Sequence, residues 1–377
     1  MSSNGRAPVS IDLSFHRLVG IRLVNPAPSD AAAVRRQIGP LEERLATTPD
    51  IVIRFVDTLE TPHGVRYLGA DDAAFTTDAF LVLRSKGKTP ARVQIPFQQI
   101  GGPCEIVCET GLPAVPLLIP ILNLTMLARG IVPLHASAFT YHGQGILVTG
   151  WAKGGKTEAL LGFMSNGAEY VSDEWVYLTP DGQHMFGIAE PIRFWDWHLQ
   201  ELPQYWARVR RADRVRLRAL RLMVQSLSWA TRSGPSRGMR SVRRMSKLTH
   251  LLKQQLYIQL PPQQIFNGRC GTMTASPQKV FFVGSHDAPD ITVRPMSTRE
   301  IAQRMVFSLQ AERQEFMTHY LKFRFAFPEQ SNQLIERAEG LQRQALHQAL
   351  TDKAAFAVHH PYPVSIPALF DAMQRVL

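Results

Sequence analysis

The sequence predicts an α/β protein in which helices flank a mixed β-sheet. The first observation behind this prediction is the order strand, glycine-rich loop, helix, strand between Gly145 and Leu178. The second is the strand-rich segment that precedes it and contains a helix of its own. Because 45% of the 377 residues are hydrophobic, the chain can bury the cores of the domains, about two or three, that its length suggests.

Residues 1–100 are expected to form an α+β accessory module. Apolar runs separated by turn sequences such as NPAPSD and TPHG predict its strands. A helix is expected from Asp30 to Ala46, with Asp30 as its N-cap. The sequence of this module contains no obvious catalytic or ligand-binding motif. The expected strands are Val19–Val24, Ile51–Val56, Val65–Leu68, Phe80–Arg84 and Val93–Phe97.

Residues 101–204 are expected to form a phosphate-loop core. An uncharged segment, Gly111–Ala128, contains Pro113, Pro116 and Pro120, which would break a membrane-spanning helix early. We therefore expect a buried helix that starts near Pro116 or Pro120, and no membrane span. The other expected elements are strands at Cys104–Glu109, Leu134–Tyr141, Gly145–Thr149 and Glu169–Leu178, and a helix at Lys156–Ser165.

The cysteines and the N-terminal sequence favour a cytoplasmic protein. The first residues, MSSNGRAPVSIDLSFHRLVG, lack the continuous apolar run of a secretory signal. Cys104, Cys108 and Cys270 are too few for a disulfide framework and lack the second ligand pair of a zinc site. All three are expected to be reduced, structural residues.

The strongest signal in the sequence is GWAKGGKT, which has the spacing G-x-x-x-x-G-K-T of a phosphate-binding loop. Glycines let backbone N–H groups converge on phosphate oxygens, and the helix that follows adds the positive end of its dipole. Lys156 is expected to reach the β- and γ-phosphates, and the Thr157 hydroxyl to ligate Mg²⁺. The residues predicted to bind the nucleotide are Gly150, Trp151, Ala152, Lys153, Gly154, Gly155, Lys156, Thr157 and Glu158.

Chemistry at such a loop also needs carboxylates, and Asp173 and Glu174 follow on the next expected strand. Adjacent strand residues point to opposite faces, so the two can act together only where the strand ends or bulges. One is expected to ligate the metal while the other approaches the acceptor. His135, on the strand before the loop, is a further candidate for contact with the phosphates or the acceptor.

The stretch LHASAFTYHGQGILVTGWAKGGKTEALLGFMSNGAEYVSDEWVYL resembles the catalytic core of the HPr kinase/phosphorylase family, which shares its kinase fold with phosphoenolpyruvate carboxykinase. The resemblance is clear over residues 134–195 and weaker over 279–308. Glu174 stands where the family usually has a second Asp. The residues that match the family's pattern in order and spacing are His135, Gly150, Gly155, Lys156, Thr157, Gly167 and Asp173.

The resemblance implies a P-loop kinase that uses Mg²⁺ and transfers the γ-phosphoryl group of ATP to a hydroxyl, usually a serine of a protein or peptide. It implies that Lys156 and the loop backbone hold the phosphates, that Asp173 is the base near the acceptor, and that Glu174 is a metal-side carboxylate. The expected metal ligands are therefore Thr157, Asp173 and Glu174, and the expected catalytic residues Asp173, His135 and Lys156. The candidates for a third carboxylate are Glu190, Asp196 and Glu201.

The positive charge is concentrated in one segment. Between Arg208 and Lys247 there are twelve Arg and one Lys against one Asp, so this segment carries +12 while the whole chain carries +11. Residues 205–275 are expected to be a basic helical insertion, with an amphipathic helix over Arg208–Ser228 and a flexible break at RSGPSRG. An acidic protein or peptide partner is favoured, with an anionic membrane surface or a merely solvated insertion as alternatives. Nucleic acid is disfavoured because few aromatic residues are interleaved.

Residues 276–377 are expected to complete the kinase core. VFFVG predicts a buried strand, STREIAQRMVFSLQ a capped helix, Gln330–Ala355 a long helical region, and the end of the chain a strand and a helix. Two other functions stay open at this point. One is a kinase for a small molecule, and the other is a nucleotide-binding switch or assembly factor that transfers little phosphate. The sequence is compatible with a monomer or an oligomer.

Overall fold

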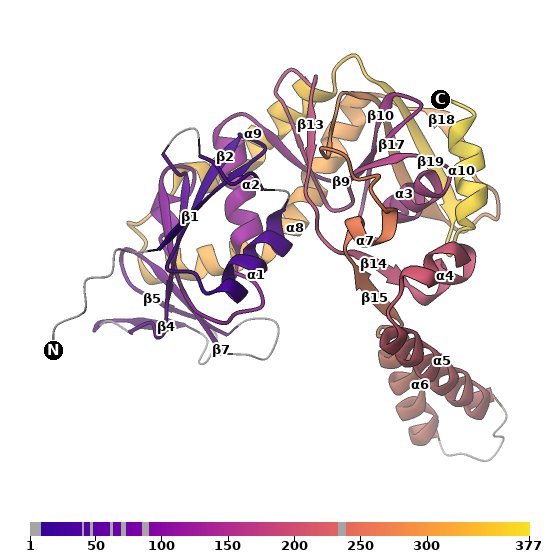
Figure 1. Ribbon diagram of the computed structural model, residues 1–377, viewed down its shortest axis with the longest axis horizontal. Coiled ribbons are helices and arrows are strands. Elements are labelled where there is room, and N and C mark those ends of the chain that lie inside the picture. Colours follow the sequence, from indigo (N-terminus) through magenta and orange to yellow (C-terminus); the bar gives the residue numbers. More distant parts are fainter. Residues whose placement is uncertain are drawn as a thin grey trace.

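The computed structural model describes residues 9–39, 41–45, 48–60, 63–68, 73–84, 90–232 and 239–377. Two β-sheets form the centres of two lobes, and a pair of helices projects from the second lobe (Figure 1). Both sheets combine parallel and antiparallel strand pairs, and helices pack against them. The predicted class, α/β with mixed sheets and flanking helices, is therefore confirmed.

The first lobe is built on a sheet that has, within the described residues, eight strands in the order β1-β2-β3-β8-β7-β6-β5-β4. The strand β8 pairs with β3 and β7, so this sheet continues past residue 100, where the sequence prediction ends the accessory module. The strands are β1 (Ser10–Phe15), β2 (Val19–Val24), β3 (Ile51–Val56), β4 (Arg66–Leu68), β5 (Ala73–Phe75), β6 (Phe80–Arg84), β7 (Pro90–Ile95) and β8 (Cys104–Glu109), and a 3-10 turn, η1, covers Phe97–Gln99.

The first helix differs from the prediction, because α1 spans Pro28–Ile38 instead of Asp30–Ala46. It ends before Gly39, which a proline follows in the sequence, and the residue before a proline disfavours helical backbone. Asp30 is not the N-cap and lies in the first turn. Its carboxylate accepts hydrogen bonds from the backbone N–H groups of Ala27 (3.0 Å) and Gly111 (2.8 Å). Asp30 therefore ties the start of α1 to the chain that leaves β8.

The second lobe is built on a sheet that has, in the described part of the chain, nine strands. Eight follow the order β16-β13-β12-β9-β10-β17-β19-β18, and β11 pairs with β9 beside this path. The pairs β10–β17 and β17–β19 are parallel. The strands are β9 (Val132–Tyr141), β10 (Gln144–Gly150), β11 (Glu169–Ser172), β12 (Trp175–Leu178), β13 (Met185–Gly187), β16 (Thr274–Ala275), β17 (Pro277–His286), β18 (Thr292–Pro295) and β19 (Ala354–Pro361).

Helices cover both faces of this second sheet. One face packs against α3 (Lys156–Ser165) and α10 (Ile366–Gln374), and the other against α8 (Thr298–Ala326) and α9 (Gln333–Leu350). The last two helices also belong to the first lobe. Ile301 and Leu309 of α8 lie in the core of the second lobe, whereas Phe316 and Phe323 of the same helix lie in the core of the first. Two continuous helices thus join the lobes.

The remaining helix predictions are right about where a helix lies, and two of them are wrong about its bounds. The apolar helix α2 (Leu118–Ala128) starts between the two predicted prolines and is largely buried. Among the described helices, none combines the length and apolarity needed to cross a membrane. The predicted helix at STREIAQRMVFSLQ extends much further, to Ala326, and Ser297 makes no side-chain cap hydrogen bond. The predicted Gln330–Ala355 region stops at Leu350 because β19 begins at Ala354.

The basic segment forms a helical hairpin, α5 (Arg211–Arg232) and α6 (Met239–Lys253), which projects from the second lobe (Figure 1). The predicted basic helix is therefore confirmed, and it starts and ends later than expected. Most of the predicted break, RSGPSRG, lies outside the described residues. The elements around the hairpin are β14 (Ile192–Trp195), α4 (Asp196–Glu201), the 3-10 turn η2 (Pro203–Arg208), β15 (Tyr257–Leu260) and α7 (Pro262–Phe266).

Candidate active site

The glycine loop connects the end of β10 to the start of α3. Gly150 (φ 153°) and Gly155 (φ 107°) adopt backbone angles that favour glycine. A Cβ atom at Gly150 would lie 2.3 Å from the carbonyl oxygen of Val283, and one at Gly155 would lie 2.2 Å from Nε2 of His360. Both glycines are therefore required by their neighbours as well as by the turn. The helix α3 then directs its free N-terminal N–H groups at the space above the loop.

Lys156 lies folded under the loop and is 6% exposed. Its ammonium group donates hydrogen bonds to the carbonyl oxygens of Gly150 (3.3 Å) and Trp151 (3.1 Å). Burial lowers the pKa of Lys156, and the nearby carboxylates of Glu174 and Asp173 oppose this effect. The two carbonyl oxygens are neutral acceptors for the Lys156 ammonium. A phosphate group above the loop would be an anionic acceptor and would bind the ammonium more strongly. The residues of the loop therefore fit a phosphate ligand.

The strand predicted at Glu169–Leu178 is interrupted at the carboxylate pair. It consists of β11 and β12, and Asp173 and Glu174 lie in the irregular step between them. Within one regular strand the two side chains would point to opposite faces. The break resolves this conflict, since both residues line the same cavity as the loop.

Asp173 is 3% exposed and has two hydroxyl partners. Ser137 of β9 donates a hydrogen bond to Oδ1 (2.7 Å), and Thr157 of α3 donates one to Oδ2 (3.1 Å). Burial, followed by the negative charge of Glu174, raises the pKa of Asp173 to about 8. The contact places Asp173 beside the loop threonine. Ser137 was not predicted, although it lies two residues beyond His135 and so on the same face of the strand.

His135 lies between two carboxylates. Its Nε2 is 3.0 Å from Oε2 of Glu174, and its Nδ1 is 3.0 Å from Oε1 of Glu312 on α8. Burial alone would lower the pKa of His135, but the hydrogen bonds to Glu174 and Glu312 outweigh it and raise the pKa. Glu312 was not predicted, because no local pattern relates α8 to a strand so far away in the sequence.

Of the three candidates for a third carboxylate, Glu190 interacts most with the predicted pair. Burial and the charge of Glu174 raise the pKa of Glu190 to about 8, and both line a neighbouring cavity of about 660 Å³. Asp196 is occupied by Arg221, which donates two hydrogen bonds to its carboxylate (2.9 and 2.5 Å). Glu201 accepts a hydrogen bond from a serine near the C-terminus (3.3 Å).

Glu158, predicted to contact the nucleotide, is buried and has a protein partner. Its Oε1 lies 3.0 Å from Nε2 of His198 on α4. Burial alone would raise the pKa of Glu158, but the contact with His198 outweighs it and lowers the pKa. His360 of β19 supports the loop from the other side, with Nε2 2.9 Å from the carbonyl oxygen of Gly154. Glu158 thus takes part in holding the loop and α3 in place.

The loop and the carboxylates open into a cavity of about 850 Å³. Trp195, Trp197 and Tyr362 form an aromatic wall, and the last turn of α6 contributes to the rim. Trp151 of the loop is 55% exposed. In the described part of the chain, no group of three or more His, Cys, Asp or Glu side chains could hold a metal ion. Mg²⁺ in nucleotide sites is commonly held by one or two carboxylates together with phosphate oxygens.

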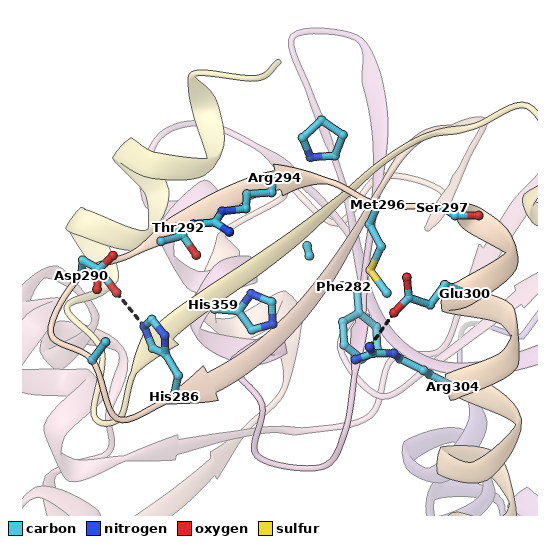
Figure 2. Close-up of a pocket in the computed structure, with 13 residues that line it drawn as sticks. Phe282, His286, Asp290, Thr292, Arg294, Met296, Ser297, Glu300, Arg304 and His359 are labelled. Carbon is cyan, nitrogen blue, oxygen red and sulfur yellow. Dashed lines mark hydrogen bonds and ion pairs between the residues drawn. The ribbon is translucent and has the colours of Figure 1, made fainter.

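A second cavity, of about 550 Å³, lies on the same sheet near its β18 edge (Figure 2). It is lined by His286 and Arg294 from the strands and by Glu300 and Arg304 from α8. Glu300 and Arg304 pair with each other, and the Arg304 guanidinium lies 5.3 Å from the centre of the Phe282 ring. None of the catalytic, nucleotide-binding or metal-binding residues predicted from the sequence lines this cavity.

Comparison with known proteins adds no relative, since no protein-family model matches the chain and no curated protein matches it. The class of the protein therefore follows from its fold and site. It is a mixed α/β protein that brings together a glycine loop, a buried lysine, a threonine and two adjacent carboxylates.

Proposed function

We propose that this protein is an ATP-dependent kinase that transfers the γ-phosphoryl group to a serine-type hydroxyl of a protein or peptide. In this proposal the second lobe is a P-loop kinase core of the HPr kinase/phosphoenolpyruvate carboxykinase type. One observation carries the proposal. Asp173, a buried carboxyl whose pKa is raised to about 8, accepts a hydrogen bond from Thr157 at the start of the loop helix.

The nucleotide would be held by the loop. Backbone N–H groups of residues 150–157 and the Lys156 ammonium would contact the phosphates, and this positive charge would stabilise the charge that develops during transfer. Thr157 and the two carboxylates would hold Mg²⁺, which would supply positive charge next to the transferred phosphoryl group. The buried position of Lys156, whose ammonium group donates hydrogen bonds to two carbonyl oxygens, supports this role.

The acceptor would enter from the open side of the cavity. Asp173 is the proposed base because it lines the cavity beside Thr157, and its raised pKa makes its ionised form a stronger base than an exposed carboxylate. Glu174 is less buried, with a side chain 42% exposed, and contacts His135. In the proposed mechanism Glu174 would help to hold the metal, and His135, fixed between Glu174 and Glu312, would position that carboxylate.

The test is a transfer assay with [γ-³²P]ATP, Mg²⁺ and a serine-containing acidic peptide, comparing wild type with Asp173→Asn. A kinase is expected to lose transfer in the variant while its affinity for ATP, measured by calorimetry, stays within about threefold. A nucleotide-dependent switch would instead keep its ATP-dependent partner binding in the variant. Transfer at the wild-type rate by Asp173→Asn would remove this residue from the mechanism.

A further inference from the structure

The helical hairpin has one face that the described part of the chain leaves exposed. On α5 this face is marked by Val215, Leu222 and Trp229, which are 61%, 64% and 71% exposed and seven residues apart. Residues at this spacing lie along one side of a helix. Two exposed arginines lie on the same side: Arg211, one turn before Val215, and Arg218, between Val215 and Leu222. The face therefore combines apolar and cationic side chains.

The base of the hairpin is fixed to the second lobe. Arg221 donates two hydrogen bonds to Asp196 of α4, and Arg216 donates one to the backbone carbonyl oxygen of Tyr257 (2.8 Å). On the opposite side of α5, Leu217 and Val224 are buried. These contacts hold the exposed face in a defined direction relative to the sheet.

The hairpin also reaches the candidate active site. His250, Lys253 and Gln254, in and just after the last turn of α6, line the cavity of about 850 Å³ that contains Lys156 and Asp173. Leu248, just before these residues, and Leu251, among them, are 46% and 58% exposed. A chain bound along the hairpin could therefore continue into the cavity without leaving the protein surface.

We infer that α5 and α6 form a docking arm for an acidic peptide segment that also carries apolar side chains, and that the arm directs the acceptor hydroxyl of this segment into the cavity. This inference rests on the proposed kinase function. The charge of the segment, +12 between Arg208 and Lys247, matches an acidic partner, and the exposed apolar residues match its hydrophobic side chains. An anionic membrane would also match the positive charge of the arm, but membrane binding would not explain why α6 reaches the rim of the cavity.

Binding can be measured without ATP, by fluorescence anisotropy of a labelled peptide of alternating Glu and Leu with one Ser. The arm variant is Arg218→Glu/Leu222→Gln, which changes two exposed positions of α5. The matched control is Arg337→Glu/Leu321→Gln, on exposed positions of α9 and α8. Far-UV circular dichroism and the affinity for ATP report on whether each variant keeps its fold.

We expect the arm variant to bind the peptide at least about tenfold more weakly than wild type, and the control to bind like wild type. Raising the salt concentration from about 0.05 to 0.5 M should weaken wild-type binding and have less effect on the arm variant. A Glu-to-Lys version of the peptide should not bind. Arg294→Glu, in the second cavity (Figure 2), should leave binding unchanged.

Equal peptide affinities of wild type and arm variant would overturn the docking role, as would a loss confined to Arg294→Glu. Phosphatidylglycerol vesicles serve as the second probe: binding to these vesicles without binding to the peptide would make the arm a membrane contact instead. The docking role and the kinase proposal can fail separately. If the peptide binds through the arm but is not phosphorylated, the kinase proposal is wrong. If transfer depends on Asp173 but the arm variant transfers at the wild-type rate, only the docking role is wrong.

Discussion

The two lobes each contain a deeply buried aspartate, and these two residues differ in what surrounds them. Asp30 in the first lobe is 1% exposed and accepts hydrogen bonds from two backbone N–H groups. Asp173 in the second lobe is 3% exposed and accepts from the hydroxyls of Ser137 and Thr157. Backbone donors are fixed by the chain, while hydroxyls can rotate and accept from other partners. The first aspartate is therefore suited to structure and the second to chemistry.

The same contrast extends to the lobes as a whole. In the described part of the first lobe, the one buried side chain with a charge is Asp30, and its other buried polar residues include Ser14, Asn123, Thr125 and Asn332. In the second lobe, the buried ionisable residues are His135, Lys156, Glu158, Asp173, Asp196, His198 and His360. Buried ionisable groups cost folding free energy unless they are paired, so their concentration in one lobe marks the candidate functional region.

The largest effect is expected from Asp173→Asn. The rate of phosphoryl transfer should fall by about 10³-fold, since a general base and its charge are both lost. The matched change in the first lobe, Asp30→Asn, should leave the rate per folded molecule within about twofold. Single-turnover kinetics on both variants measure the difference. Equal losses in the two variants would contradict the division between the lobes.

Next is Lys156→Met, which should weaken ATP binding by about a hundredfold, because in the proposed site its buried ammonium is the principal positive charge that would face the phosphates. Lys153→Met, on the exposed part of the loop, serves as the control and should change affinity by less than about threefold. Calorimetric titration with ATP measures both. If Lys153 matters as much as Lys156, the phosphates bind at the rim and not at the start of α3.

A third change tests the structural aspartate. Asp30→Ala should lower the free energy of unfolding by about 2 kcal/mol, because the N–H groups of Ala27 and Gly111 lose their acceptor. Urea denaturation measures this loss, and the affinity for ATP at low denaturant should remain unchanged. A variant as stable as wild type would mean that water replaces the carboxylate without cost.

The free energy of unfolding should depend on pH because of Glu190 in the second lobe. Burial and the charge of Glu174 raise the pKa of Glu190 to about 8. The unfolded carboxyl ionises near its ordinary value of 4.5, so the stability that neutral Glu190 contributes is complete below that value and is lost as the pH rises to about 8. Glu190→Gln stays neutral and should gain about 1 to 2 kcal/mol over wild type between pH 5 and pH 8. Urea denaturation at both pH values measures the gain, and the same difference in the free energy of unfolding between the two proteins at pH 5 and pH 8 would contradict this prediction.

The smallest effect concerns Glu312, the carboxylate that α8 contributes to His135. Glu312→Gln should lower the pKa of His135, because one of its two anionic partners is removed. Transfer should slow by about threefold to tenfold, as expected for a residue that acts through another. NMR titration of the imidazole measures the pKa. An unchanged pKa together with slower transfer would assign Glu312 a direct contact with the substrate instead.

The loop and its helix were predictable because their signals are local. The bounds of α3, Lys156–Ser165, agree with the prediction, since glycines require the turn before the helix and Asn166-Gly167 favours its end. His135, Asp173 and the loop were also assigned to one site from the sequence, and in the structure they line one cavity. The interruption between β11 and β12 was foreseen as the condition under which both carboxylates could act together.

Other parts of the site depend on contacts between distant segments. Glu312 reaches His135 only because α8 packs across the sheet, and no spacing in the sequence encodes that approach. The role of Asp30 likewise depends on Gly111, which the fold brings to it from beyond β8. Such contacts follow from tertiary packing, which patterns of a few residues do not specify.

The sharing of α8 between two cores has a practical consequence for dissecting the protein. A fragment that begins after the first sheet would keep the loop, the carboxylates and Glu312, yet Phe316, Tyr320 and Phe323 would lose their apolar cover. Three large aromatic side chains exposed on one helix are a strong stimulus to aggregation. Expressing the second lobe alone should therefore yield insoluble material unless these positions are made polar, even though every residue of the candidate active site is present.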